Sequence, residues 1–79
     1  MNIVWNTIQE QAKAELDRLA DLYKQASEQF NNSIGKIGEK ENHSIAMDIF
    51  NQMETTKRAY AALGITGQVG VHYISKVGA

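Results

Sequence analysis

The 79-residue sequence contains no cysteine and no proline. The absence of cysteine excludes disulfides, thiolate metal ligands and a cysteine nucleophile. The absence of proline removes the strongest helix breaker, which favours a mostly helical chain. Acidic side chains are missing from one whole segment, because all nine lie before the last 25 residues.

Positive charge concentrates where the acids are missing. Residues 55–79 carry Lys57, Arg58 and Lys76, whereas residues 1–54 carry five basic and nine acidic side chains. The two parts therefore have formal charges of +3 and −4, which sum to the net charge of −1. A basic segment on a slightly acidic chain indicates either an anionic partner or the head-to-tail assembly of copies.

The length predicts a single domain, 1–79, that buries only about 60% of its unfolded surface. Such a domain is marginally stable alone, which favours self-association. The charged share of 22% and the hydrophobic share of 43% indicate a folded chain. The start, MNIVWN, has no basic region and no long apolar run, so we expect neither a signal peptide nor a membrane span. We expect a cytoplasmic protein, with export by a signal-less secretion system left open.

Apolar side chains recur every three or four residues near the start of the chain. This spacing predicts an amphipathic helix of coiled-coil type in the segment 5–31. We expect the helix to start near Asn6 or Thr7, because Thr7 can form a capping box with Glu10. Such a long helix needs a second long helix or another chain to cover it. The large side chains of the stripe are the expected oligomer interface: Trp5, Ile8, Leu16, Leu19, Tyr23 and Phe30.

The middle of the chain is rich in asparagine and glycine, which predicts a connection over residues 32–43. Ile34 and Ile37 are expected to fold back onto the core. A second helix is expected to begin at Asn42–Ser44, within the segment 44–79. Its apolar stripe, which starts at Ile45, keeps its phase through Thr55-Thr56 up to Leu63.

The second half leaves two questions open. The helix could run unbroken from 45 to 63, or the chain could break near Thr55, since β-branched residues have a slightly lower helix propensity. After Gly64, residues 67–77 read as a helix or as a short alternating strand, and we favour the helix. The predicted fold is therefore all-α: a long N-terminal helix, an Asn/Gly turn, a second helix and a short C-terminal helical segment.

The segment from Arg58 to Thr66, RAYAALGIT, resembles the first helix and turn of a helix-turn-helix of the Fis type, and Val71–Gly78 is similar to the second helix of MerR-type motifs. This resemblance implies a dimeric DNA-binding regulator. Leu63 and Ile65 would join its two helices. The expected contacts to phosphates and bases are Lys57, Arg58, Thr66, Gln68, His72 and Lys76.

The whole chain also resembles needle and inner-rod subunits of type III secretion systems, in its length, its tryptophan at position 5 and its two amphipathic helices around a polar middle. That resemblance implies a protein–protein assembly module such as a filament subunit. A small phage or plasmid inhibitor protein is a third reading.

No catalytic or metal-binding pattern accompanies these features. His43 and His72 are far apart in sequence, and we expect His72 to be a surface residue. We expect Asp17, Asp21 and Glu28 to form a solvated helix flank. The sequence thus predicts a non-enzymatic binding protein without cofactor, metal or small-molecule substrate. It is expected to form a homo-oligomer through the first helix, and DNA binding is favoured slightly over assembly.

Overall fold

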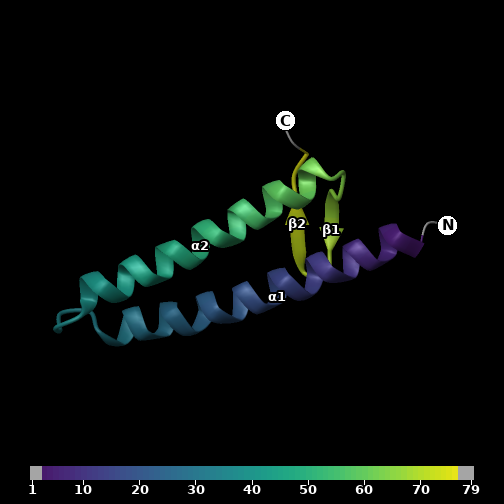
Figure 1. The fold of residues 1–79 in the computed structure, drawn as a ribbon. Coiled ribbons are helices and arrows are strands. Elements are labelled where there is room, and N and C mark those ends of the chain that lie inside the picture. Colours follow the sequence, from purple (N-terminus) through teal and green to yellow (C-terminus); the bar gives the residue numbers. More distant parts are fainter. Residues whose placement is uncertain (1–2, 77–79) are drawn as a thin grey trace.

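A computed structural model describes residues 3–76, with side chains described from residue 6 onward. It contains two long helices, α1 (Ile3–Asn32) and α2 (Glu39–Ala62), followed by two short strands, β1 (Gly67–Val69) and β2 (His72–Ile74). The helices lie side by side as an antiparallel hairpin, and the strands cross them near the N-terminal end of α1 (Figure 1). The expected helical hairpin is present, but the C-terminal segment is a strand pair rather than a helix.

Helix α1 covers the predicted range 5–31 and begins earlier, at Ile3. Thr7 therefore lies inside the helix rather than at its cap. The turn that follows is held by Ser33, whose hydroxyl donates to the Phe30 carbonyl at 2.9 Å. Ile34 and Ile37 do not fold back onto the core as expected, since they are 57% and 102% exposed.

Helix α2 begins at Glu39, several residues before the predicted start at Asn42–Ser44. Gly38 precedes it with a φ of 96°, and no side chain caps the helix. The first turn contains Glu39 and Glu41, whose negative charges are favourable at the positive end of a helix. The helix is continuous through Thr55-Thr56, so the break considered there does not occur.

The β-hairpin depends on two glycines with positive φ, Gly67 at 87° and Gly70 at 62°. Gly70 is the first residue of a two-residue turn, the position at which a type II′ hairpin turn favours glycine. The strands pair in antiparallel register, with Val69 opposite His72 and Gln68 opposite Tyr73. The helix favoured for residues 67–77 is therefore wrong, because both glycines adopt a backbone that an α-helix excludes; Val77 lies outside the described residues.

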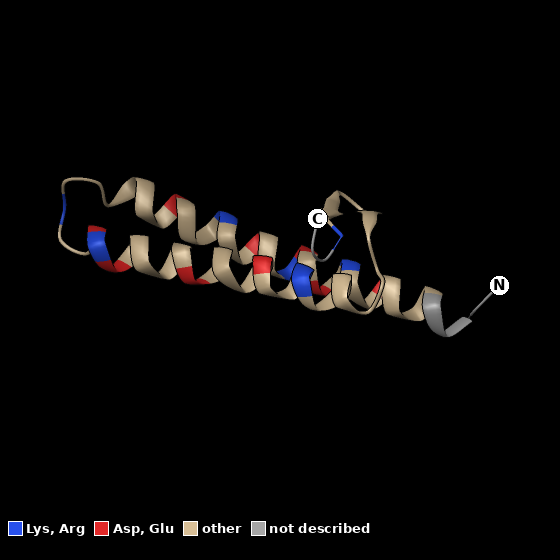
Figure 2. Ribbon diagram, turned by 90° about the horizontal axis from the view of Figure 1, so that it is seen from above, with Lys and Arg blue, Asp and Glu red and all other residues tan. Residues whose placement is uncertain are grey.

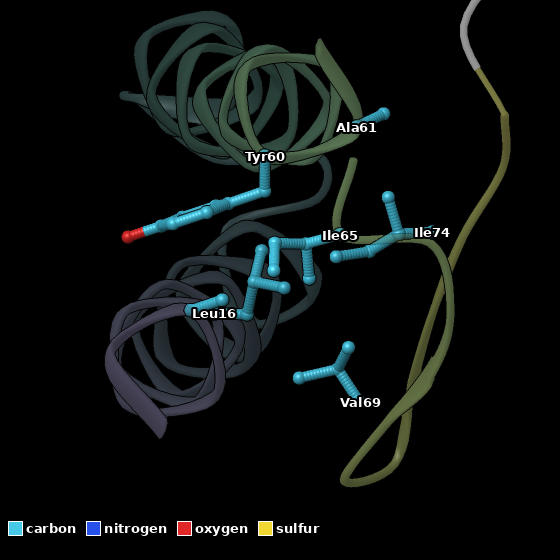
Figure 3. Packing of buried hydrophobic residues seen from close by; sticks show 7 residues of the cluster. Leu16, Tyr60, Ala61, Ile65, Val69 and Ile74 are labelled. Atoms are coloured by element: carbon cyan, nitrogen blue, oxygen red, sulfur yellow. The ribbon is translucent and has the colours of Figure 1, made fainter. Parts of the chain in front are cut away.

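The core lies where the hairpin straps both helices together. Ile65 follows the end of α2 and points between the helices, while Val69 and Ile74 reach in from the strands (Figure 3). The buried cluster consists of Ala12, Leu16, Tyr60, Ala61, Ile65, Val69 and Ile74. The other half of the molecule, toward the helix–helix turn, contains only the two helices (Figure 1).

Candidate functional site

The three cations of the acid-free segment lie along one groove. This groove has a volume of about 510 Å³. The C-terminal part of α2 lines one side of it, and β2 with the residues that follow β2 lines the other. In Figure 2 the basic positions near the end of α2 and next to the C-terminus lie close together, away from the helix–helix turn. The groove is lined by Glu54, Lys57, Arg58, Ala61, Ala62, Tyr73, Ser75 and Lys76.

The groove is positively charged. Three of its side chains are cationic and one, Glu54, is acidic, so its formal charge is +2. The carboxylate of Glu54 lies 3.9 Å from the Lys57 amine, at the outer limit of an ion pair. Lys57 and Arg58 are neighbours in the sequence. Lys76 lies in the same groove only because the chain reverses its direction twice after α2.

Tyr73 and Ser75 belong to this groove but were not among the predicted site residues. On β2 the burial alternates, so that His72 and Ile74 face the helices and Tyr73 remains 63% exposed. The alternating strand pattern of this segment contained the signal that Tyr73 faces outward, but a helix was favoured there.

The remaining predicted DNA contacts lie elsewhere. Thr66 is half-buried in the segment between α2 and β1. Gln68 is exposed, and its side-chain amide donates to the Gly70 carbonyl at 2.9 Å. His72 is buried and faces α1, so its expected surface position is wrong. The six residues predicted to contact DNA therefore do not form one surface.

His72 is held by a carboxylate on α1. Its Nε2 lies 2.7 Å from Oδ1 of Asp17, while the second oxygen of Asp17 accepts from the Lys13 amine, also at 2.7 Å. Asp17 is therefore not simply part of a solvated flank as expected. The hydrogen bond from Lys13, and then the one from His72, lower the pKa of the Asp17 carboxyl from its usual value. This contact fastens the β-hairpin to α1.

A second long-range polar contact joins the two helices. The Tyr60 hydroxyl donates to a carboxylate oxygen of Glu15 at 2.7 Å. This hydrogen bond raises the pKa of the Tyr60 phenol, with burial adding to the effect, because both favour the neutral form. Like the His72–Asp17 contact, it joins two separate elements of the fold.

The fold buries some residues of the predicted oligomer interface and places others in contacts between the two helices. Leu16 and Leu19 are buried within the chain, and Ile8 packs against the core cluster, so Leu16 and Leu19 are not available to a second chain. Tyr23 and Phe30 make ring contacts with Phe50 and His43 at centroid distances of 5.9 and 5.2 Å. The side chain of Trp5 lies outside the described residues. Several large apolar side chains on both helices remain exposed instead: Leu22, Ile45, Met47 and Phe50.

Comparison of the chain with protein-family models, curated proteins and solved structures finds no match. Within residues 3–76, no three His, Asp or Glu side chains are grouped so that they could hold a metal ion. None of the described helices is both long and apolar enough to cross a membrane.

The Asp17 contact predicts a dependence of stability on acid pH. Because the folded pKa of Asp17 lies below its unfolded value of about 3.8, its charge contributes stability above that pH, and the contribution is lost as the pH falls through the lower folded pKa. Asp17→Asn should therefore destabilise the protein at neutral pH, and the difference from wild type should shrink as the pH falls below the unfolded pKa of Asp17. Urea unfolding at a series of pH values measures this. Asp21→Asn, which removes an exposed carboxylate bonded only to Gln25 in the same helix, is the matched control; an equal effect would show that Asp17 has no special role.

Proposed function

We propose that this chain is a non-enzymatic assembly module, which pairs with a second copy through the half of the helical hairpin that the strands leave uncovered. Met47 and Phe50 are exposed on one face of α2, and the strands cover the other end of that face. This exposure is the observation that carries the proposal. With Tyr23, which contacts Phe50, these residues form what we name the Phe50 surface.

Helical spacing supports this placement. Met47, Phe50, Glu54, Arg58 and Ala61 follow one another at steps of three or four residues, so they share one face of α2. At Ala61 this face is buried in the core cluster, which Ile65 and Ile74 complete. At Phe50 no strand lies over the helices, and 39% of the side chain remains exposed. Met47 and Phe50 thus form an uncovered apolar end of this face, separated from the covered end at Ala61 by the charged residues Glu54 and Arg58.

The dimensions of the molecule support a partner of similar size. Its radius of gyration is 15.2 Å, against about 12 Å for a compact domain of this length. Its accessible surface is 5669 Å², roughly 900 Å² more than a compact monomer of its mass exposes. A standard stable interface buries about 800 Å² on each partner. The excess surface is of the same order as the area that one copy would bury against another.

DNA binding is the less favoured alternative. A helix-turn-helix places its second helix in the major groove, and the segment expected to supply that helix forms β1 and β2. The resemblance to secretion needle and inner-rod subunits agrees better with a long helical hairpin. We retain filament growth as one outcome of the test.

Sedimentation at a series of protein concentrations tests the proposal. Wild type should reach the mass of a dimer, and Phe50→Glu should weaken association by about 30-fold or more, because a charge replaces an aromatic anchor. Asn51→Glu adds the same charge at the next, exposed residue and should leave association unchanged. Circular dichroism confirms that each variant keeps its helices, and Met47→Glu repeats the test at a second position.

The outcomes separate the alternatives. A wild-type chain that stays monomeric at all concentrations would overturn the proposal, as would association that Phe50→Glu leaves intact. A mass that grows beyond the dimer and is abolished by Phe50→Glu would replace the closed dimer by an open filament.

A further inference from the structure

The outer edge of β2 has backbone groups without a strand partner. Val69 and His72 flank the two-residue turn and therefore form the hydrogen-bonded pair of the antiparallel ladder. Tyr73, opposite Gln68, is in the next pair, whose N–H and C=O groups point away from the neighbouring strand. The N–H and C=O of Tyr73 thus point away from β1, outward from the two-stranded sheet.

The cationic groove lies along that outer edge. Its lining includes Tyr73 and Ser75 but no residue of β1, which places it on the free side of β2. Lys57 and Arg58 of α2 form the opposite wall, and Lys76 lies at the end of the strand side. A backbone donor and acceptor, three cations and an exposed tyrosine ring therefore face the same space.

We propose that this groove binds an acidic, extended peptide segment of a partner protein, which adds a third strand to the sheet beside β2. Main-chain hydrogen bonds to Tyr73 would give such a segment its register, and pockets for alternate side chains would give it specificity. Glutamate or aspartate side chains on one side of the segment would meet Lys57, Arg58 and Lys76.

Residues 1–79 do not themselves supply such a segment. All nine acidic residues of this chain lie between Glu10 and Glu54, and each of them is in α1 or α2. None can enter the groove as part of an extended strand while the fold persists. The groove lies further along the α2 face that carries Phe50, but its lining includes none of the residues of the Phe50 surface, and the proposal does not depend on the dimer.

A peptide fits the groove better than a nucleic acid does. The Tyr73 backbone presents one donor and one acceptor, whereas phosphate oxygens only accept hydrogen bonds. Three cations would also release few counterions from DNA, which gives little affinity at moderate salt. An extended peptide satisfies both the donor and the acceptor, and its carboxylates satisfy the cations.

Amide chemical shifts of the full chain, recorded during titration with short blocked peptides, test the proposal. An alternating valine–glutamate pentapeptide should shift the amides of residues 72–76 and of Lys57 and Arg58, and should slow hydrogen exchange at Tyr73. The matching valine–lysine peptide should bind at least tenfold more weakly. A single-stranded oligothymidylate and a DNA duplex of mixed sequence serve as nucleic-acid probes.

Matched variants separate the charge from the strand edge. Lys57→Ala with Arg58→Ala should weaken binding of the acidic peptide about tenfold or more, whereas Lys36→Ala with Lys40→Ala removes the same charge at the distant turn and should not. Tyr73→Pro removes the outward N–H together with the tyrosine ring and should abolish binding, while Tyr73→Thr also removes the ring but keeps that N–H and should retain most of it.

Three results would overturn the proposal: equal affinity for the glutamate and lysine peptides, equal binding by Tyr73→Pro and Tyr73→Thr, or tighter binding of either nucleic acid than of the acidic peptide. Titration of Phe50→Glu alongside wild type separates the test of peptide binding from the test of dimer formation. A monomeric variant that still binds the peptide supports the groove whatever the assembly state, and a dimer that ignores the peptide refutes only the groove.

Discussion

Ile65→Ala should lower the free energy of unfolding by about 2–5 kcal/mol, because it removes a large side chain from a tightly packed site. Ile65 is 0% exposed and lies between Leu16 of α1, Tyr60 of α2 and Ile74 of β2, so its loss leaves a cavity where three elements meet (Figure 3). A domain of this size has a total stability of roughly 4–12 kcal/mol. The variant should therefore melt about 10–30 °C below wild type, at equal protein concentration.

Leu63→Ala is the matched control, since Leu63 is two residues away and 60% exposed. It should change stability by no more than about 0.5 kcal/mol. Equal losses for the two variants would mean that the end of α2 is not packed as described. A minor loss for Ile65→Ala alone would mean that the β-hairpin can close the cavity by shifting toward α1.

The helical hairpin was predictable because each helix contains a long apolar stripe with one period. The stripe through Thr55-Thr56 kept its phase, and the continuous α2 follows that phase rather than the weak preference of threonine for other structures. The start of α2 was not predictable from the same signal. Residues 39–43 contain no apolar periodic positions; they follow Gly38, and their acidic side chains Glu39 and Glu41 are favourable in the first turn of a helix.

The strand pair was missed because the sequence there gave two conflicting patterns. Val69 and Tyr73 fit one helical face, while His72 and Ile74 alternate with Val71 and Tyr73. The structure buries the histidine and exposes the valine and the tyrosine, opposite to what their hydrophobicity suggests. The reason is Asp17, which lies 55 residues away in the sequence and supplies the hydrogen bond that makes a buried His72 acceptable. No local pattern contains that information.

The candidate groove was predictable only in part. Charge counting selected Lys57, Arg58 and Lys76 from the sequence, and these three do line one groove. The resemblance to a helix-turn-helix added Thr66, Gln68 and His72, which lie outside it because the segment forms strands. Tyr73 enters only through the sheet register, since the register determines which side chain and which backbone groups face outward.

Ile74→Asp should release the β-hairpin from the helices. Ile74 is 1% exposed, and a carboxylate there would lose its hydration without a cation beside it in the core cluster. Burying an unpaired charge costs several kcal/mol, so we expect residues 65–74 to detach and expose the side chain to water instead. Hydrogen exchange should show loss of protection in β1 and β2, while most of the helical circular dichroism remains.

Tyr73→Asp is the control for this prediction, because it places the same charge one residue earlier on the outward side of β2. There the carboxylate faces water and the cations of the groove, so the strands should stay protected. If Ile74→Asp instead abolishes the helical signal, the helices do not persist without the strands and the whole chain unfolds as one unit. Local release predicts that Leu16, which Ile74 helps to cover, becomes accessible while α1 and α2 still pair near Tyr23 and Phe50.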